Sequence, residues 1–384
     1  MYLLNRLSFL YFFGISATLF SKQNYVELKT KYSDSKIEIS LGSQRIINVG
    51  KPINFTRKLH YTIDDTSFIV WNNKLTNKIE FYTIEPFKMI DSIDVSNLML
   101  SEDNNVLDII PNKSTVIIVT KNYLHIIDRK GTILYSEKIN DYNNSKQKYY
   151  YGNIYNCYES YIYGNILYMY ESFYKGPQNL DYFNKPIEVK FDLENKTKVS
   201  NTIYQSKLLQ NKKINYGLVR NASKISHDSI GVITFQNDAN IYQYNYVNNK
   251  MDTFGGKSSY QIKPIASLSK KYFKDQEIQF KHYSHQPWYT NIVWDPYRKC
   301  YFRFYLQERL KNDSTQTNSS FLDRHLIMML FNDRFELINE KDVGQYKQFG
   351  YGYLFITKNN IYLQEISNYM NKSVISLKEI LLKK

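Results

Sequence analysis

The sequence is poor in residues that cross-link or interrupt a chain. Its 384 residues contain two cysteines, eight prolines and fourteen glycines. The two cysteines, Cys157 and Cys300, exclude a disulfide-rich scaffold, and the sequence leaves open whether they pair with each other. Beyond residue 21 no apolar run is long enough to span a membrane, so the body of the chain is expected to fold in water. Its length allows a large buried core.

The N-terminus has the layout of a secretory signal peptide. Arg6 precedes a mostly apolar stretch, residues 7–20, and polar sequence follows. We expect cleavage near Ser21, which gives a signal peptide at 1–21 and a mature domain at 22–384; an uncleaved N-terminal anchor is the alternative. No cysteine lies near the end of the signal, so the pattern of a lipid-modified N-terminal cysteine is missing. The predicted location is the periplasm, the outer-membrane surface or the extracellular space.

Positive charge is in excess but is not gathered in one run of sequence. The formal net charge is +14 and the isoelectric point is near 9.3. Lysines are scattered among asparagines, as in NKLTNK (73–78), and no block of five or six like charges occurs. This pattern is typical of solvated strand edges and turns and does not favour nucleic-acid binding. The expected partner is a protein, a peptide or a glycan.

Aromatic residues are abundant and suit β-strands. The chain has 37 tyrosines and 22 phenylalanines, which fit a pleated, half-buried surface. One pattern, an apolar strand followed by a hairpin into an alternating strand, recurs at intervals of very roughly fifty residues, the range of propeller blades. The copies are not identical. Six units are predicted to begin near Phe68, Thr115, Ile162, Ile230, Tyr301 and Tyr353.

These units predict an all-β fold, a single six-bladed β-propeller of antiparallel sheets. The early strand SKIEISLG (35–42) is expected to pair with the last blade and close the ring. Two stacked β-sandwiches are the alternative. Only residues 267–278 and 376–384 carry signals for short helices.

The stretch WDPYRKCYFRFYLQERL (294–310) has alternating side chains. Cys300, Phe302, Phe304 and Leu306 form the expected core face. The other face carries Arg303, which we expect between two tyrosine rings on an amphipathic surface. A structural strand with a cation–π ladder is favoured over a ligand-binding face.

Candidate binding residues lie in and beside this stretch. In KHYSHQPWY (281–289), two histidines share an H-x-x-H spacing that could bind zinc on a helix, but Pro287 and the tyrosines favour a loop. Two tryptophans flank it. We select Trp288, Trp294, His282, His285 and Arg303 as possible ligand contacts.

Sequence motifs for catalysis and cofactors are missing. GGKSS (255–259) ends like a phosphate-binding loop, but Met251 stands where that loop requires glycine. Neither a G-x-S-x-G nucleophile elbow nor a calcium loop occurs. No catalytic residue, metal or cofactor is therefore predicted.

Three segments resemble a known family. WDPYRKCYFRFY (294–305), HLIMMLFNDRFELINEKDV (325–343) and YGYLFITKNNIYLQEI (351–366) resemble the C-terminal part of the domain of unknown function 4221 family. The resemblance implies an exported, propeller-like protein of the bacterial cell envelope, found mainly in Bacteroidetes and often lipid-anchored. This sequence departs from the family in having no cysteine after the signal. The family offers no catalytic residues to transfer.

Two functions remain open. One is a non-enzymatic exported propeller that binds a protein, peptide or glycan through loops at one end of its channel. The other is a hydrolase or lyase whose site lies in the central channel, which requires polar side chains from several blades to converge on the axis.

Overall fold

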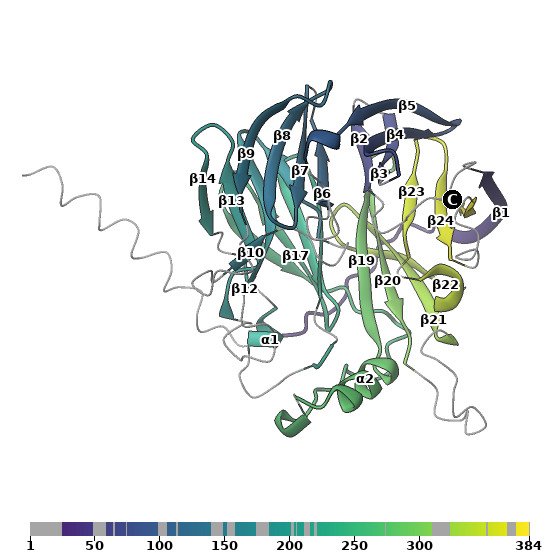
Figure 1. Ribbon diagram of the computed structural model, residues 1–384. Helices are drawn as coiled ribbons and strands as arrows, with labels where there is room; N and C mark the ends of the chain where they lie inside the picture. Colours follow the sequence, from purple (N-terminus) through teal and green to yellow (C-terminus); the bar gives the residue numbers. More distant parts are fainter. Residues whose placement is uncertain are drawn as a thin grey trace, which may run out of the picture.

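The computed structural model (Figure 1) contains six small antiparallel sheets arranged around one axis, so the protein is a six-bladed β-propeller. The predicted signal peptide and Cys157 lie outside the residues that the structure describes, whereas Cys300 is a buried, free thiol. The described residues are 25–48, 59–63, 66–73, 75–98, 106–112, 114–139, 149–151, 158–173, 184–200, 203–204, 206–210, 216–218, 221–272, 274–308, 323–350, 352–366 and 374–383.

The first three blades follow one another along the chain. Blade 1 contains β2 (Leu59–Ile63), β3 (Thr66–Asn73), β4 (Lys78–Ile84) and β5 (Phe87–Asp94), followed by the short helix η1 (Ser96–Leu98). Blade 2 contains β6 (Val106–Pro111), β7 (Thr115–Thr120), β8 (Tyr123–Asp128) and β9 (Ile133–Lys138). Blade 3 contains β10 (Tyr149–Tyr151), β11 (Tyr161–Tyr163), β12 (Ile166–Phe173), β13 (Glu188–Asp192) and β14 (Thr197–Ser200).

An α-helix precedes each of the remaining three blades. After α1 (Lys207–Gln210), blade 4 contains β15 (Ala222–His227), β16 (Ile230–Phe235), β17 (Asp238–Asn245) and β18 (Lys250–Phe254). After η3 (Lys270–Tyr272) and α2 (Gln276–His285), blade 5 contains β19 (Trp288–Asp295), β20 (Cys300–Leu306), β21 (His325–Asn332) and β22 (Leu337–Gln345). After α3 (Tyr346–Phe349), blade 6 contains β23 (Leu354–Ile356), β24 (Ile361–Glu365), β25 (Val374–Lys383) and β1 (Glu38–Asn48).

The six predicted sequence units correspond one to one with the six blades. Four of the units begin at the second strand of a blade, because the sequence pattern identified the central apolar strand first. The first strand of those blades was missed. The ring excludes the alternative of two stacked sandwiches.

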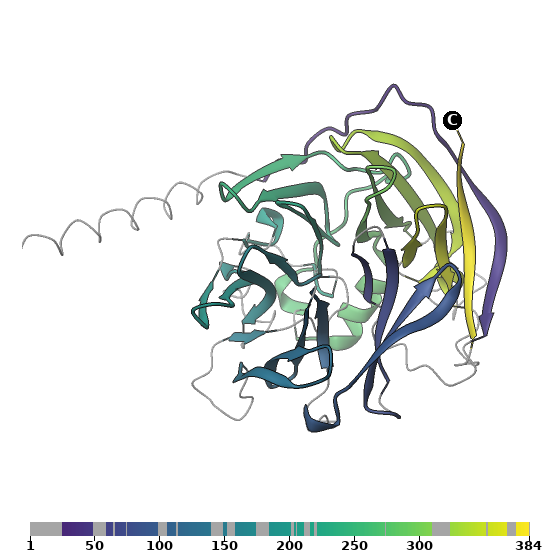
Figure 2. The ribbon, with the colours of Figure 1, turned by 90° about the horizontal axis from the view of Figure 1, so that it is seen from above.

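Ring closure follows the predicted route. β1 pairs antiparallel with β25, from Glu38 opposite Lys383 to Asn48 opposite Val374. Figure 2 shows these two strands side by side at the outer rim. The last blade therefore combines both ends of the described chain, as expected from residues 35–42.

Both helix predictions need correction. The tail at 376–384 is not a helix, because its residues lie in β25, which is paired on both sides by β24 and β1. Tertiary pairing overrides the helix-forming residues of SLKEILLKK. The segment at 267–278 is helical only in part: η3 covers Lys270–Tyr272, and α2 begins at Gln276 and continues to His285.

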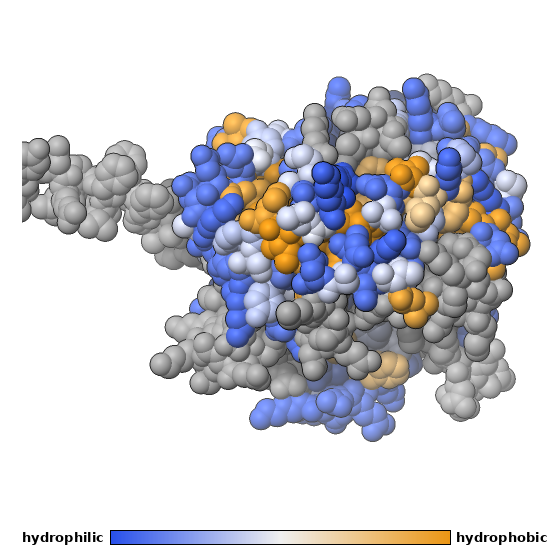
Figure 3. Space-filling view, turned by 45° about the horizontal axis from the view of Figure 1, so that its top comes forward, coloured by the Kyte–Doolittle hydropathy of each residue, from blue (hydrophilic) through white to orange (hydrophobic). Residues whose placement is uncertain are grey.

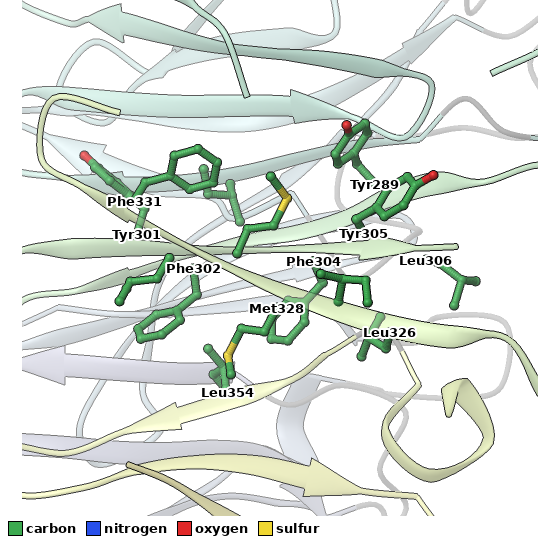
Figure 4. Close-up of a cluster of buried hydrophobic side chains, with 14 of the residues drawn as sticks. Tyr289, Tyr301, Phe302, Phe304, Tyr305, Leu306, Leu326, Met328, Phe331 and Leu354 are labelled. Carbon is green, nitrogen blue, oxygen red and sulfur yellow. The ribbon is translucent and has the colours of Figure 1, made fainter. Parts of the chain in front are cut away.

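The prediction that residues 300–307 present an amphipathic face is wrong. All seven residues of β20 are buried. Figure 4 shows Phe302 and Phe304 on the side of Leu354, which belongs to blade 6, with Tyr301 and Tyr305 on the other side. A strand in the middle of a blade is covered by neighbouring blades on both faces, so alternation does not bring either face to solvent.

Glu85 joins blade 1 to blade 6 across the closure. It accepts hydrogen bonds from Thr357 Oγ1 (2.7 Å), Asn360 Nδ2 (2.6 Å) and the Tyr362 hydroxyl (2.5 Å), and Arg45 Nη1 lies 3.7 Å from Oε1. Burial raises the pKa of Glu85, but these hydrogen bonds and the Arg45 charge outweigh it and hold the pKa below its ordinary value. The ionised carboxylate therefore stabilises the junction.

We expect Glu85→Ala to lower the free energy of unfolding by about 2 to 3 kcal/mol at neutral pH, because three donors lose their acceptor. The difference from wild type should shrink as pH falls below about 4.5, since a depressed carboxyl pKa contributes stability that is lost on protonation. Urea unfolding of both proteins at several pH values measures this. Glu194→Ala, in an exposed turn, is the control; an equal loss there would contradict the role of Glu85.

Candidate functional site

The two ends of the sheets differ in how their strands are joined. Within a blade, turns of two to four residues join the first strand to the second and the third strand to the fourth. These turns lie at one end of the sheets, which we call the hairpin end. They are 64–65, 85–86, 112–114, 129–132, 164–165, 193–196, 228–229, 246–249, 296–299, 333–336 and 357–360. Because the strands are antiparallel, the strand ends joined by the other connections between consecutive strands lie at the opposite end, the connection end, except for the link 152–160 between β10 and β11. These connections are 49–58, 74–77, 95–105, 121–122, 139–148, 174–187, 201–221, 236–237, 255–287, 307–324, 346–353 and 366–373.

The connection end carries the α-helices. The connection at 255–287 is the longest and contains α2; Figure 1 shows α1 and α2 below the sheets, and in Figure 2 α2 lies behind the central part of the ring. α2 begins where the Asp275 side chain accepts a hydrogen bond from the Ile278 amide at 3.0 Å. Among the described residues, the α-helices and the longest connection therefore lie at this end.

Arg324 and Trp288 fix the C-terminal end of α2 to blade 5. The Arg324 guanidinium donates to the carbonyl oxygens of Ser284 (3.1 Å) and Gln286 (2.7 Å) and lies 4.3 Å from the centre of the Trp288 ring. Tyr283 stacks on the same indole with ring centres 4.2 Å apart. Trp288 is fully buried by these contacts, so its position is that of a packing residue.

His282 and His285 lie on α2 and not in the predicted loop. His282 Nε2 is 2.8 Å from the Ala266 carbonyl oxygen, and burial lowers the pKa of its imidazole more than this hydrogen bond raises it. His285 Nδ1 is 2.7 Å from the carbonyl oxygen of Lys281. Within the described ranges, no group of three or more His, Cys, Asp or Glu side chains is placed to hold a metal ion.

Trp294 lies at the opposite end of β19 from Trp288. It is half-buried and stacks on His227, with ring centres 4.1 Å apart and an interplanar angle of 9°. His227 Nε2 is also 2.6 Å from the Tyr301 hydroxyl. The two tryptophans therefore belong to different ends of the ring, and His227 is a member of this cluster that the sequence did not reveal.

Arg303 is fully buried between blades 4 and 5. Its guanidinium donates to the carbonyl oxygens of Ala239 (2.6 Å), Asp238 (2.7 Å) and Gly256 (3.2 Å) and lies 3.9 Å from the centre of the Tyr289 ring. Burial lowers its pKa to about 10. A cation–π contact is present, but Tyr289 supplies the ring in place of the expected neighbours Tyr301 and Tyr305, and carbonyl oxygens accept the guanidinium hydrogen bonds.

A short segment of the chain lies inside the ring. Tyr158 bridges to Lys224 of β15 in parallel, and the Glu159 amide donates to the Lys224 carbonyl oxygen at 3.1 Å. Because β15 is the innermost strand of blade 4 and its other edge pairs with β16, residues 158–160 must occupy the axial side. The Ser226 amide donates to the Glu159 carboxylate at 2.9 Å.

Glu159 is the carboxylate most perturbed by this location. Burial raises its pKa to about 8; the Ser226 hydrogen bond and the Lys224 charge oppose this, and the charge of Asp108 on blade 2 adds to it. The side chain nevertheless keeps part of its surface accessible. It is therefore an acid within the channel whose pKa is raised well above that of an ordinary glutamate.

Lys224 forms a buried ion pair between blades 3 and 4. Its ammonium contacts the Glu188 carboxylate, and both side chains are fully buried. The Tyr158 hydroxyl donates to the same carboxylate at 2.9 Å. Three tyrosine rings surround the ammonium, with ring centres at 5.2, 5.5 and 5.4 Å: Tyr158, Tyr168 and Tyr246.

Gly231 leaves space for Tyr246, one of the three tyrosines around the Lys224 ammonium. A Cβ atom at that position would lie 2.5 Å from the Tyr246 hydroxyl oxygen and 3.4 Å from Lys224 Cε. The sequence analysis missed Lys224 and Glu188. Neither residue stands out in its strand, because β15 reads ASKISH and β13 reads EVKFD, both with further polar residues.

The comparisons support the fold. No family model matches the sequence, and no curated protein matches it. A solved structure of a DUF4221 family member from Bacteroides vulgatus is similar to this chain, with a TM-score of 0.71 and 15% identity, over 92% of this chain and 100% of that one. This likeness shows a shared propeller fold. The predicted resemblance is confirmed at the level of the fold.

A second solved structure is similar to this chain. It is a Bacteroides fragilis protein whose name describes it as exported; the TM-score is 0.51 with 7% identity, over 92% of this chain and 98% of that one. At these identities the likeness concerns architecture alone. Among the described residues of this chain, no helix is long and apolar enough to cross a membrane.

Proposed function

We propose that this six-bladed propeller is an exported protein that binds another molecule at the connection end and catalyses no reaction. The observation that carries this proposal is the contrast between the two ends: turns of two to four residues at one, and connections of up to 33 residues at the other. Binding residues typically lie on loops that a rigid scaffold holds in place. Residues 158–160 occupy part of the channel, which favours binding at the end of the ring.

Export is part of the proposal. The signal-like sequence at 1–21 supports it, as does the name of the similar Bacteroides fragilis protein. Cell fractionation of a bacterial host, with mass spectrometry of the N-terminus, tests it. We expect the mature protein outside the cytoplasm and beginning near residue 22; a cytoplasmic protein that keeps its first residues would contradict export.

Site-specific cross-linking tests the binding end. A photoreactive amino acid at Phe280, an exposed position on α2, should capture a discrete partner in cells that make the protein. The same probe at Asn248, an exposed position in a hairpin-end turn, is the matched control and should not. Capture from Asn248 alone, or from neither position, would contradict binding at the connection end.

The alternative is a hydrolase or lyase with its site in the channel. The observation that favours it is Glu159, a partly accessible carboxylate with a pKa of about 8 beside Asp108 and Lys224. A general acid needs a pKa near the working pH. A turnover that Glu159→Gln abolishes without changing the thermal unfolding temperature would establish this alternative in place of the first.

A further inference from the structure

Positive charge is concentrated at the connection end. Among the described residues, the connections that meet there contain 11 lysines and arginines against four aspartates and glutamates. The described residues of the hairpin-end turns contain seven against five. The excess of basic residues, which looks scattered along the sequence, is therefore gathered on one side by the topology. A polarised charge distribution of this kind attracts partners of opposite sign.

The connection at 255–287 holds the best-described part of this charge. It contains six lysines and two acidic residues, and one of these acids, Asp275, is the N-cap of α2. Four of the lysines are exposed: Lys263, Lys271, Lys274 and Lys281. No described acidic side chain forms a salt bridge with any of these four.

Apolar side chains are exposed among these lysines. Ile262 is 77% exposed, Phe280 is 55% exposed and Tyr260 is 39% exposed. The contacts of Arg324 and Trp288 hold α2 against blade 5, so this surface is fixed before a partner arrives. Preorganisation reduces the entropy lost on binding. The surface thus combines exposed apolar side chains with lysines that form no salt bridge to a described acid; Lys271 lies over the Tyr272 ring at 4.7 Å.

We propose that the connection end binds an anionic glycan, a polysaccharide that carries carboxylate groups. This inference rests on the proposed function and names its partner class. Lysine ammonium groups act as point charges that can meet carboxylates along a flexible polymer. Apolar side chains such as Phe280 and Ile262 can pack against the C–H faces of sugar rings.

The composition of the surface disfavours other polyanions. Among the described basic residues of these connections, Arg324 is the one arginine, the residue suited to bidentate phosphate contacts, and it is already used by α2. A bilayer surface would favour a helix with a broad apolar face. The lower edge of Figure 3, where α2 lies, is mostly hydrophilic, whereas the side turned forward mixes polar residues with small apolar areas.

Binding to polygalacturonate tests the inference. We expect the exported protein to bind this polymer but not neutral dextran, with an affinity that falls steeply as salt rises. Replacing Lys263, Lys271, Lys274 and Lys281 together by glutamine should weaken binding about tenfold or more at low salt and flatten the salt dependence. Calorimetric titration measures both quantities.

The matched control removes the same charge from the other end. Lys130, Lys250, Lys299 and Lys358 are exposed at or beside hairpin-end turns, and their replacement by glutamine should change the affinity less than about twofold. Equal losses in the two variants would overturn the inference, because binding would then follow net charge alone. Tighter binding to single-stranded DNA or to phosphatidylglycerol vesicles would also overturn it, in favour of those partners.

Failure of this inference is distinct from failure of the proposed function. If polygalacturonate does not bind while the probe at Phe280 captures a partner, the glycan class is wrong and binding at the connection end stands. If neither succeeds, both are wrong.

Discussion

Replacing Lys224 by methionine is expected to lower the free energy of unfolding by about 3 to 5 kcal/mol. The substitution leaves the Glu188 carboxylate fully buried without its cation, and an uncompensated buried charge is far more costly than the loss of the pair's attraction. Tyr158 still donates one hydrogen bond to Glu188, which is not enough to replace the ammonium. Urea unfolding at neutral pH measures the change.

The double variant Lys224→Met with Glu188→Leu separates charge from packing. We expect it to be more stable than Lys224→Met alone, because removing both charges also removes the desolvation penalty. Lys190→Met is the matched control: this lysine also lies over the Tyr168 ring, at 5.6 Å, but it is half-buried. A loss below about 1 kcal/mol in Lys224→Met would contradict the role of the ion pair.

Arg303→Met should be destabilising to a similar degree, by about 3 to 5 kcal/mol. The carbonyl oxygens of Ala239 and Asp238 would lose their charged donor within the interior, and a buried acceptor without a donor keeps its full desolvation penalty. Hydrogen exchange should rise most at the β16–β17 turn, 236–237. Urea unfolding and exchange measured by mass spectrometry check the two parts of this result.

Arg303→Lys and Arg129→Met complete that experiment. Lysine keeps the charge but cannot donate to several carbonyl groups in the planar arrangement of a guanidinium, so it should recover only part of the loss. Arg129 is partly exposed and donates to the Asn112 carbonyl oxygen, so its replacement should cost less than about 1 kcal/mol. Equal effects of Arg303→Met and Arg129→Met would show that burial of the guanidinium does not matter.

The architecture was predictable because it depends on local patterns that repeat. Apolar strands and short turns recur in every blade, so the number of units and the closing strand followed from the sequence. The helix positions and the burial of β20 did not, because both depend on neighbours distant in sequence. In β25, pairing with β1 outweighs helix propensity.

The candidate site was less predictable for the same reason. His282 and Trp288 were found from their residue types, but their partners Ala266 and Arg324 come from elsewhere in the chain and give them packing roles. Lys224 and Glu188 are 36 residues apart and meet only when two blades pack together. Positive charge looks scattered along the sequence, because the order of residues does not show which connections lie at the same end of the ring.

The pairing of β1 with β25 sets the order of events during biosynthesis. The sheet of blade 6 combines residues 38–48 with residues 374–383, so two segments far apart in the sequence must meet. The ring cannot close during translation until residues 374–383 have been made, and a nascent chain halted before residue 374 would leave strand edges of blade 6 unpaired.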